Sequence, residues 1–115
     1  MLDKMLFIET PTFTKLLTNL IDDDSYSKLQ ENLVLNPEIG NLIPGAGGLR
    51  KIRWKLPGIG KRGGIRIIYY WKVKEEQIIF LLIYPKNVQD DMTDTQLKIL
   101  NKILKEELNN GSQAV

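Results

Sequence analysis

Two side-chain types are missing from this chain of 115 residues, cysteine and histidine. Without cysteine the chain can form neither a disulfide nor a thiolate nucleophile, and nothing in it argues for an oxidising compartment. Histidine is the usual general acid or base near neutral pH and the commonest metal ligand. Any catalysis must therefore use Lys, Arg, Tyr, Asp or Glu, and a zinc site is close to excluded.

Long apolar runs are missing as well. No stretch approaches the roughly 18 to 20 residues that a membrane-spanning helix needs. The first residues do not have the layout of a secretory signal, because Asp3 and Glu9 interrupt any apolar segment. We therefore expect a cytoplasmic protein with no membrane partner. The length suits one domain over residues 1–110, followed by a frayed tail over 111–115.

Charge is abundant but strongly segregated. Residues 1–49 carry three Lys and seven acids, and residues 75–115 carry four Lys and seven acids. Between them, residues 50–74 carry nine Lys or Arg and no acid. A block of +9 among strand-forming residues predicts a surface that binds a polyanion, although charge runs are often only solvated loops.

Hydrophobic periodicity and capping residues predict the order β-α-α-β-β-β-α. The fold class is α+β, a small antiparallel sheet with helices packed on one face. Thr10 and Pro11 begin the first helix, one of residues 22–25 caps the second, and Thr93 with Gln96 forms a capping box before the third. The expected strands are 5–9, 49–54, 65–71 and 77–84; 36–48 is a loop, and the third helix frays from about residue 109.

Period-two alternation places the basic side chains of the strands on one face. Lys51 and Arg53 share a face of their strand, and Arg66 shares a face with Ile68 and Tyr70. If the apolar face packs on the helices, the three cations can converge on the open face, where a multivalent anion would stabilise them. The alternative for Arg66 is a salt bridge to a helix acid such as Glu31.

Two further features have both a functional and a structural interpretation. The glycine-rich turn 55–64 lacks the spacing of a phosphate-binding loop. It is either a mobile basic loop that closes on RNA through Lys61 and Arg62 or a plain hairpin turn. The acid clusters 22–24 and 90–91 could hold Mg²⁺, but no motif supports such a site. Helix capping accounts for both clusters, and we expect neither a metal nor a cofactor.

Three segments together resemble the RelE superfamily of toxins, most closely its HigB-type members. They are GLRKIR at 48–53, GIRIIYY at 64–70 and LIYPKN at 82–87. The resemblance implies a toxin of a type II toxin–antitoxin system that enters the ribosomal A site and cleaves mRNA without a metal. The ribose 2′-OH would attack the adjacent phosphate, leaving a 2′,3′-cyclic phosphate and a 5′-OH. A cognate antitoxin, expected to be of helix-turn-helix type, would hold the toxin inactive.

The resemblance also implies the catalytic residues, which are Lys51, Arg53, Arg66, Tyr84, Lys86 and Asn87. RelE itself has arginine where this chain has Asn87, and a tyrosine further on where this chain has only residues 90–93. The general base therefore stays open: Tyr84 and Lys86 are nearby substitutes. Because neighbouring cations favour the neutral form of a lysine, we hypothesise that Lys51 or Lys86 is the base. Our candidates for RNA contact are Arg50, Lys55, Lys61, Arg62 and Tyr70.

Two other functions fit the same fold. ParE-like relatives poison DNA gyrase and do not cut RNA. The basic residues on both middle strands and the Y-x-K-N turn favour RNA cleavage over that activity. A non-catalytic RNA-binding module would need exposed aromatic side chains for base stacking. Tyr70 could serve, but Tyr69 and Trp71 alternate to the core face, which argues against a stacking platform.

Overall fold

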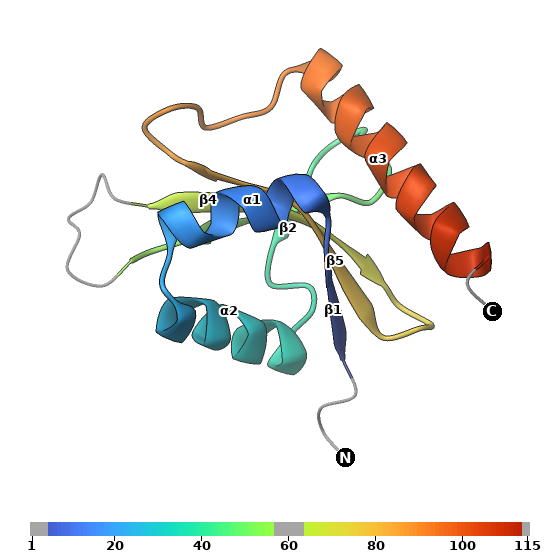
Figure 1. The fold of residues 1–115 in the computed structure, drawn as a ribbon. Coiled ribbons are helices and arrows are strands. Elements are labelled where there is room, and N and C mark those ends of the chain that lie inside the picture. Colours follow the sequence, from blue (N-terminus) through green and yellow to red (C-terminus); the bar gives the residue numbers. More distant parts are fainter. Residues whose placement is uncertain (1–4, 57–63, 114–115) are drawn as a thin grey trace.

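The computed structural model describes residues 5–56 and 64–113, which form one sheet with helices on both of its faces (Figure 1). The predicted order of elements is confirmed, with one further short strand, β2. The elements are β1 (Leu6–Glu9), α1 (Pro11–Leu20), α2 (Asp23–Leu35), β2 (Asn41–Leu42), β3 (Arg50–Trp54), β4 (Ile65–Lys72), β5 (Gln77–Pro85) and α3 (Asp94–Gln113).

Side-chain caps fix the starts of the first two helices. The hydroxyl of Thr10 accepts a hydrogen bond from the backbone N–H of Phe13. Pro11 occupies the first position of the helix, where a backbone N–H would have no partner within the helix. The carboxylate of Asp22 accepts from the backbone N–H of Ser25 at 2.8 Å. Both starts lie where the sequence predicted them, because a cap is a local signal that needs no tertiary contact.

The third helix begins with the predicted capping box. The backbone N–H of Gln96 donates to the hydroxyl of Thr93 at 3.1 Å, and the Gln96 side-chain oxygen accepts from the backbone N–H of Thr93 at 2.8 Å. The backbone of α3 continues to Gln113, beyond the position near residue 109 at which the polar sequence predicted fraying.

The strand order is β1-β5-β4-β3-β2. The pairs β2–β3, β3–β4 and β4–β5 are antiparallel, as predicted. The edge strand β1 instead lies parallel to β5, with Leu6 opposite Gln77. A parallel pair needs a long crossover connection, and the chain from α1 to β4 supplies it. The predicted α+β fold with an antiparallel sheet is therefore confirmed for β2 to β5, and only the pairing of β1 at the edge is parallel.

The short strand β2 lies in the segment expected to be a loop. Asn41 pairs with Lys51 and Leu42 with Arg50. The chain then turns back through three glycines with positive φ, Gly45, Gly47 and Gly48. A strand of two residues is too short to show alternation in sequence, so only the glycine-rich turn was visible.

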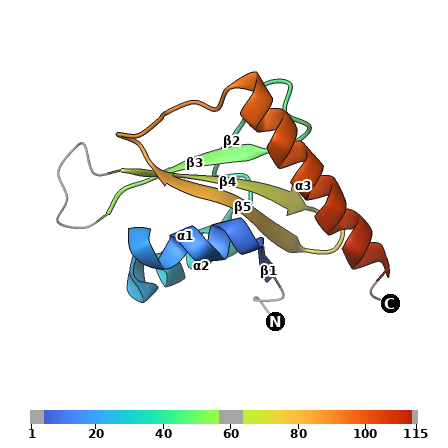
Figure 2. The ribbon, with the colours of Figure 1, turned by 45° about the horizontal axis from the view of Figure 1, so that its top comes forward.

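The helices cover both faces of the sheet, and not one face as expected. The helices α1 and α2 lie on one face and α3 lies on the other (Figure 2). Ile67 and Tyr69 of β4 belong to the core under α1 and α2, whereas Ile68 packs with Leu100 and Leu104 of α3. The reason is visible in β4 and β5, whose apolar runs bury consecutive residues on both sides. A sheet that is apolar on both faces needs a helix on each.

The connection from β5 to α3, residues 86–93, completes the face on which α3 lies. It leaves the end of β5 and runs to the start of α3, and its contacts reach β3 and β4 (Figure 2). We call it the 86–93 segment. Within residues 5–56 and 64–113, no helix combines the length and hydropathy that crossing a bilayer requires.

Candidate functional site

A row of three side chains crosses adjacent strands on the face that carries α3. Arg53 on β3 lies opposite Arg66 on β4, and Arg66 lies opposite Tyr84 on β5. Lys51 lies two residues before Arg53 and therefore on the same face. The faces predicted from alternation are those of the structure. We call Lys51, Arg53 and Arg66 the cation cluster.

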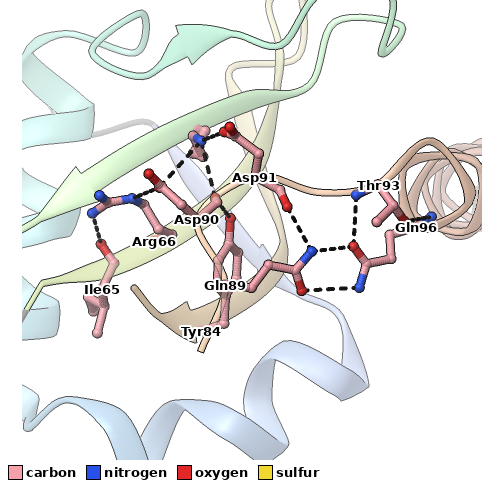
Figure 3. A network of polar contacts seen from close by, with 9 residues as sticks. Ile65, Arg66, Tyr84, Gln89, Asp90, Asp91, Thr93 and Gln96 are labelled. Atoms are coloured by element: carbon pink, nitrogen blue, oxygen red, sulfur yellow. Dashed lines mark hydrogen bonds and ion pairs between the residues drawn. The ribbon is translucent and has the colours of Figure 1, made fainter. Parts of the chain in front are cut away.

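Arg66 is an arginine inside a core strand. Its side chain is only 6% exposed, and Ile65 and Ile67 beside it are buried. Its Nε donates to Oδ1 of Asp90 at 2.8 Å, and one terminal nitrogen reaches the carbonyl of Ile65 at 3.4 Å (Figure 3). A buried guanidinium needs such partners, because an unpaired charge there would be strongly destabilising.

Lys51 contacts the same segment from the next strand. Its Nζ lies 2.5 Å from Oδ1 of Asp91 and 3.2 Å from the carbonyl oxygen of Asp90. The Asp90 carboxylate is 3.8 Å from the same nitrogen. Lys51 and Arg66 therefore both contact Asp90, and this shared partner brings the two cations together on one face of the sheet.

Arg53 differs from its two neighbours. It is exposed, and among the described residues it makes no ion pair. It lies directly across from Arg66, so the two guanidinium groups extend from the same place on the sheet. Arg53 is thus the member of the cation cluster that an approaching anion can reach first.

Asp90 and Asp91 are the residues that sequence reasoning missed. Their adjacency was ascribed to helix capping, but Thr93 is the cap of α3, and the two carboxylates bind Arg66 and Lys51. The sequence expectation that Arg66 would otherwise pair with a helix acid such as Glu31 is also corrected, since its partner is Asp90. The feature of the sequence that could have indicated this contact is charge, because two acids follow shortly after the last strand of a sheet that carries basic side chains.

The charge of Asp90 is stabilised by this arrangement. The hydrogen bond from Arg66 holds the pKa of the Asp90 carboxyl below its ordinary value, and the charges of Arg66, Lys51 and Arg53 act in the same direction. At neutral pH the carboxylate is therefore ionised and behaves as an anion bound by the cation cluster.

Tyr84 completes the row but is poorly suited to accept a proton. Its side chain is 8% exposed, and its hydroxyl donates to the carbonyl oxygen of Asp90 at 2.8 Å. Burial, and then the charge of Asp90, raise the pKa of Tyr84 to about 12. The phenol is protonated at neutral pH, which makes it a hydrogen-bond donor that positions Asp90.

The remaining candidate residues are not brought into the cation cluster. Arg50 lies on the opposite face, where its guanidinium donates to the carbonyl of Gly40 at 2.8 Å and contacts Glu38. Tyr70 is half-buried in the core beneath α3. Lys55, Lys86 and Asn87 are exposed, the first after β3 and the other two in the turn after β5. Lys61 and Arg62 lie outside the described residues.

The turn that carries Lys86 is tied back to the sheet. The backbone N–H of Lys86 donates to the carbonyl oxygen of Gly64 at 3.0 Å, which places the turn beside the start of β4. As for metals, no three side chains of Asp or Glu gather as ligands in the part of the chain that the structure describes.

Comparison with known proteins finds similarity to a protein family and to solved structures. The family described as the RelE toxin of the RelE/RelB toxin–antitoxin system matches residues 40–114. A solved structure of a mutant E. coli toxin RelE in the free state is similar, with a TM-score of 0.55 and 12% sequence identity, covering 75% of this chain and 87% of that chain. At this identity the structural likeness shows the fold alone. The family match spans well over half of the chain and includes the whole cation cluster, and the chain belongs to the RelE toxin family.

Proposed function

We propose that this toxin cleaves mRNA in the ribosomal A site, using the cation cluster and no metal ion. The observation that carries the proposal is the cross-strand pair of Arg53 and Arg66, with Lys51 on the same face, inside the region that matches the family. Three cations on neighbouring strands can surround one phosphodiester. Two of them contact carboxylates of the chain itself, which supports a role for the cluster in binding anionic oxygens.

The reaction is a transesterification within the RNA. The ribose 2′-oxygen attacks the adjacent phosphorus, the bond from phosphorus to the 5′-oxygen breaks, and a 2′,3′-cyclic phosphate and a 5′-OH result. Negative charge accumulates on the phosphoryl oxygens in the transition state, and preorganised cations there are usually the largest catalytic contribution. Arg66 is preorganised because it is packed in a strand, whereas Arg53 can adjust from its exposed position.

A base must take the 2′-OH proton, and the leaving 5′-oxygen must gain one. Our candidates for the base are Lys51, which lies in the cation cluster, and Lys86, which is exposed in the turn after β5. Tyr84 is set aside because its pKa is raised to about 12. The dependence of rate on pH separates the two lysines. We expect Lys→Arg at the true base to change the profile, and an unchanged profile in both variants would refute the assignment.

The partner of the toxin is an antitoxin, as the RelE/RelB description of the family indicates. We propose that an acidic stretch of an antitoxin of helix-turn-helix type neutralises this chain by competing for its basic sheet. A ribosomal substrate also implies action in the cytoplasm.

The alternative of a non-catalytic RNA-binding module finds no support in the sheet. Tyr69 is fully buried, and Tyr70 and Trp71 are half-buried against the core, so none of them offers a free ring face to a base. Gyrase poisoning would not require cations opposed across β3 and β4. The cation cluster therefore favours RNA chemistry over both alternatives.

The direct test is to induce the toxin in bacteria and map new 5′-OH ends on translated mRNA. We expect ends within codons for the wild type and for Lys74→Ala, an exposed lysine outside the cation cluster, and a loss of those ends for Arg53→Ala. Arg53 is the better test than Arg66, because removing an exposed side chain does not leave Asp90 without its partner. Ends that persist in Arg53→Ala would refute the proposal.

A further inference from the structure

We infer that the 86–93 segment occludes the site of its own chain, with the carboxylates of Asp90 and Asp91 in the places that RNA phosphate oxygens take. The inference rests on the proposed function, because it concerns the same site, and it adds how that site is regulated. The free toxin would be closed, and RNA would open it by displacing the segment.

Burial is the first reason. The Arg66 side chain is 6% exposed and that of Lys51 is 11% exposed, so little of either group is open to a phosphate while the segment is in place. Arg66 instead contacts Asp90 (Figure 3). Lys51 contacts both Asp90 and Asp91. Carboxylate and phosphate oxygens satisfy the same donors of Arg and Lys. The two cations can therefore bind RNA only by exchanging one set of anionic oxygens for the other.

The second reason is that separate contacts attach the 86–93 segment to the sheet, so RNA can break them one at a time. Asp91 is 84% exposed, and its carboxylate is held by Lys51. Asp90 is held at its carboxylate by Arg66 and at its carbonyl oxygen by Tyr84 and Lys51. Ion pairs of exposed groups contribute little and weaken with salt. Asp91 is thus the contact that competing phosphate breaks first.

The far end of the segment links this opening to α3. The side-chain amide of Gln89 donates to the Gln96 side-chain oxygen at 2.6 Å, and that oxygen also accepts from the N–H of Thr93 in the capping box (Figure 3). Movement of the segment must therefore disturb the first turn of α3. Arg53, which is exposed on the same face and makes no ion pair among residues 5–56 and 64–113, offers the initial contact for RNA before Lys51 and Arg66 are released.

Binding of an uncleavable RNA tests the occlusion without catalysis. The probe is a short single-stranded RNA with a 2′-O-methyl group on every ribose, which leaves no 2′-hydroxyl to attack a phosphate, titrated at low salt. We expect Asp91→Asn to bind about three- to fivefold more tightly than wild type, the size expected for one exposed ion pair. The matched control is Glu106→Gln, which removes one negative charge from an exposed position on α3 and should change affinity less than about twofold.

Equal affinities of Asp91→Asn and Glu106→Gln would overturn the occlusion and leave the proposed function intact. Failure of the proposed function has a different signature, in which Arg53→Ala binds RNA as tightly as wild type. Hydrogen exchange in the wild-type protein gives a second measurement. We expect the backbone amides of residues 88–93 to exchange faster in the RNA complex; unchanged or slower exchange would show that the segment stays on the sheet or closes over the RNA.

Discussion

At the scale of single residues, the unusual feature is an arginine held inside an apolar strand. Arg66 has buried isoleucines as its chain neighbours, and its charge is compensated by Asp90. Pairs of this kind add little net stability compared with apolar residues, yet losing one partner is costly. A charged pair at this position is therefore better explained by function than by folding. On the function proposed above, the arginine is there to bind an RNA phosphate in place of Asp90.

Asp90 should make the protein sensitive to acid. Its folded-state pKa is lowered, so its contribution to stability is present above the ordinary carboxyl value of about 4 and is lost as pH falls through the lowered value. We expect Asp90→Asn to be less stable than wild type at pH 7 and the difference to shrink in acid. Urea unfolding at both pH values measures this. A difference that stays constant or grows in acid would contradict the pairing with Arg66.

We expect Tyr84 to position Asp90 and not to act as the general base. Tyr84→Phe removes the hydrogen bond to the carbonyl of Asp90 but keeps the ring in the core. We expect the cleavage rate to fall less than about tenfold, because loss of a general base would cost about 10² to 10⁴-fold. The pH profile between 7 and 9 should keep its shape, since the pKa of Tyr84 is about 12. A loss beyond a hundredfold would assign Tyr84 to the chemistry.

At the scale of elements, the start of α3 and the 86–93 segment form one unit. The side-chain oxygen of Gln96 accepts hydrogen bonds from the backbone N–H of Thr93, in the capping box, and from the side-chain amide of Gln89. We expect Gln96→Ala to lower the free energy of unfolding by about 1 kcal/mol, the usual contribution of a cap. Lys98→Ala, at an exposed position one turn into the helix, is the control and should be nearly neutral.

The same variant has a local readout. Backbone amides of residues 89–93 should exchange faster in Gln96→Ala than in the control, because the segment loses its attachment to α3. If both variants exchange alike, the segment and the helix are independent, and the coupling between site and α3 is wrong.

Local signals predicted the elements, but not how they come together. The caps at Thr10, Asp22 and Thr93 and the alternation around Arg66 are encoded within a few residues, and the structure confirms them. The parallel pairing of β1, the second face covered by α3 and the partner of Arg66 depend on contacts between distant segments. Asp90 lies 24 residues from Arg66, and no periodicity reports such a contact.

At the scale of the whole molecule, charge is distributed so that a basic sheet lies between acidic flanking segments. The block 50–74 supplies all members of the cation cluster, and part of the acidic remainder folds back onto it as Asp90 and Asp91. On the proposed function and the inferred occlusion, the protein carries both a polyanion site and a weak internal competitor for it. We expect such an arrangement to limit nonspecific binding of RNA while leaving the site available to a multivalent ligand.

Salt dependence follows from this arrangement. Affinity for single-stranded RNA should fall with salt at a log–log slope of about −0.7 for each phosphate contacted. Arg53→Ala should make the slope shallower, because one cation no longer meets the backbone. Fluorescence titrations across a range of salt concentrations measure both slopes. A flat dependence in the wild type would contradict the assignment of the basic face to RNA.

The most direct test of the central claim is the rate of single-turnover cleavage of mRNA on programmed ribosomes by wild type, Arg53→Ala, Arg66→Ala and the double variant, with Lys74→Ala as control. We expect the cleavage rate of each single variant to fall by about 10² to 10³-fold, the effect of removing one transition-state donor. The double variant should lose less than the product of the two, since both arginines act on one phosphate. Cleavage by Arg53→Ala within about threefold of the control would contradict the claim that the paired arginines of β3 and β4 stabilise the reacting phosphodiester.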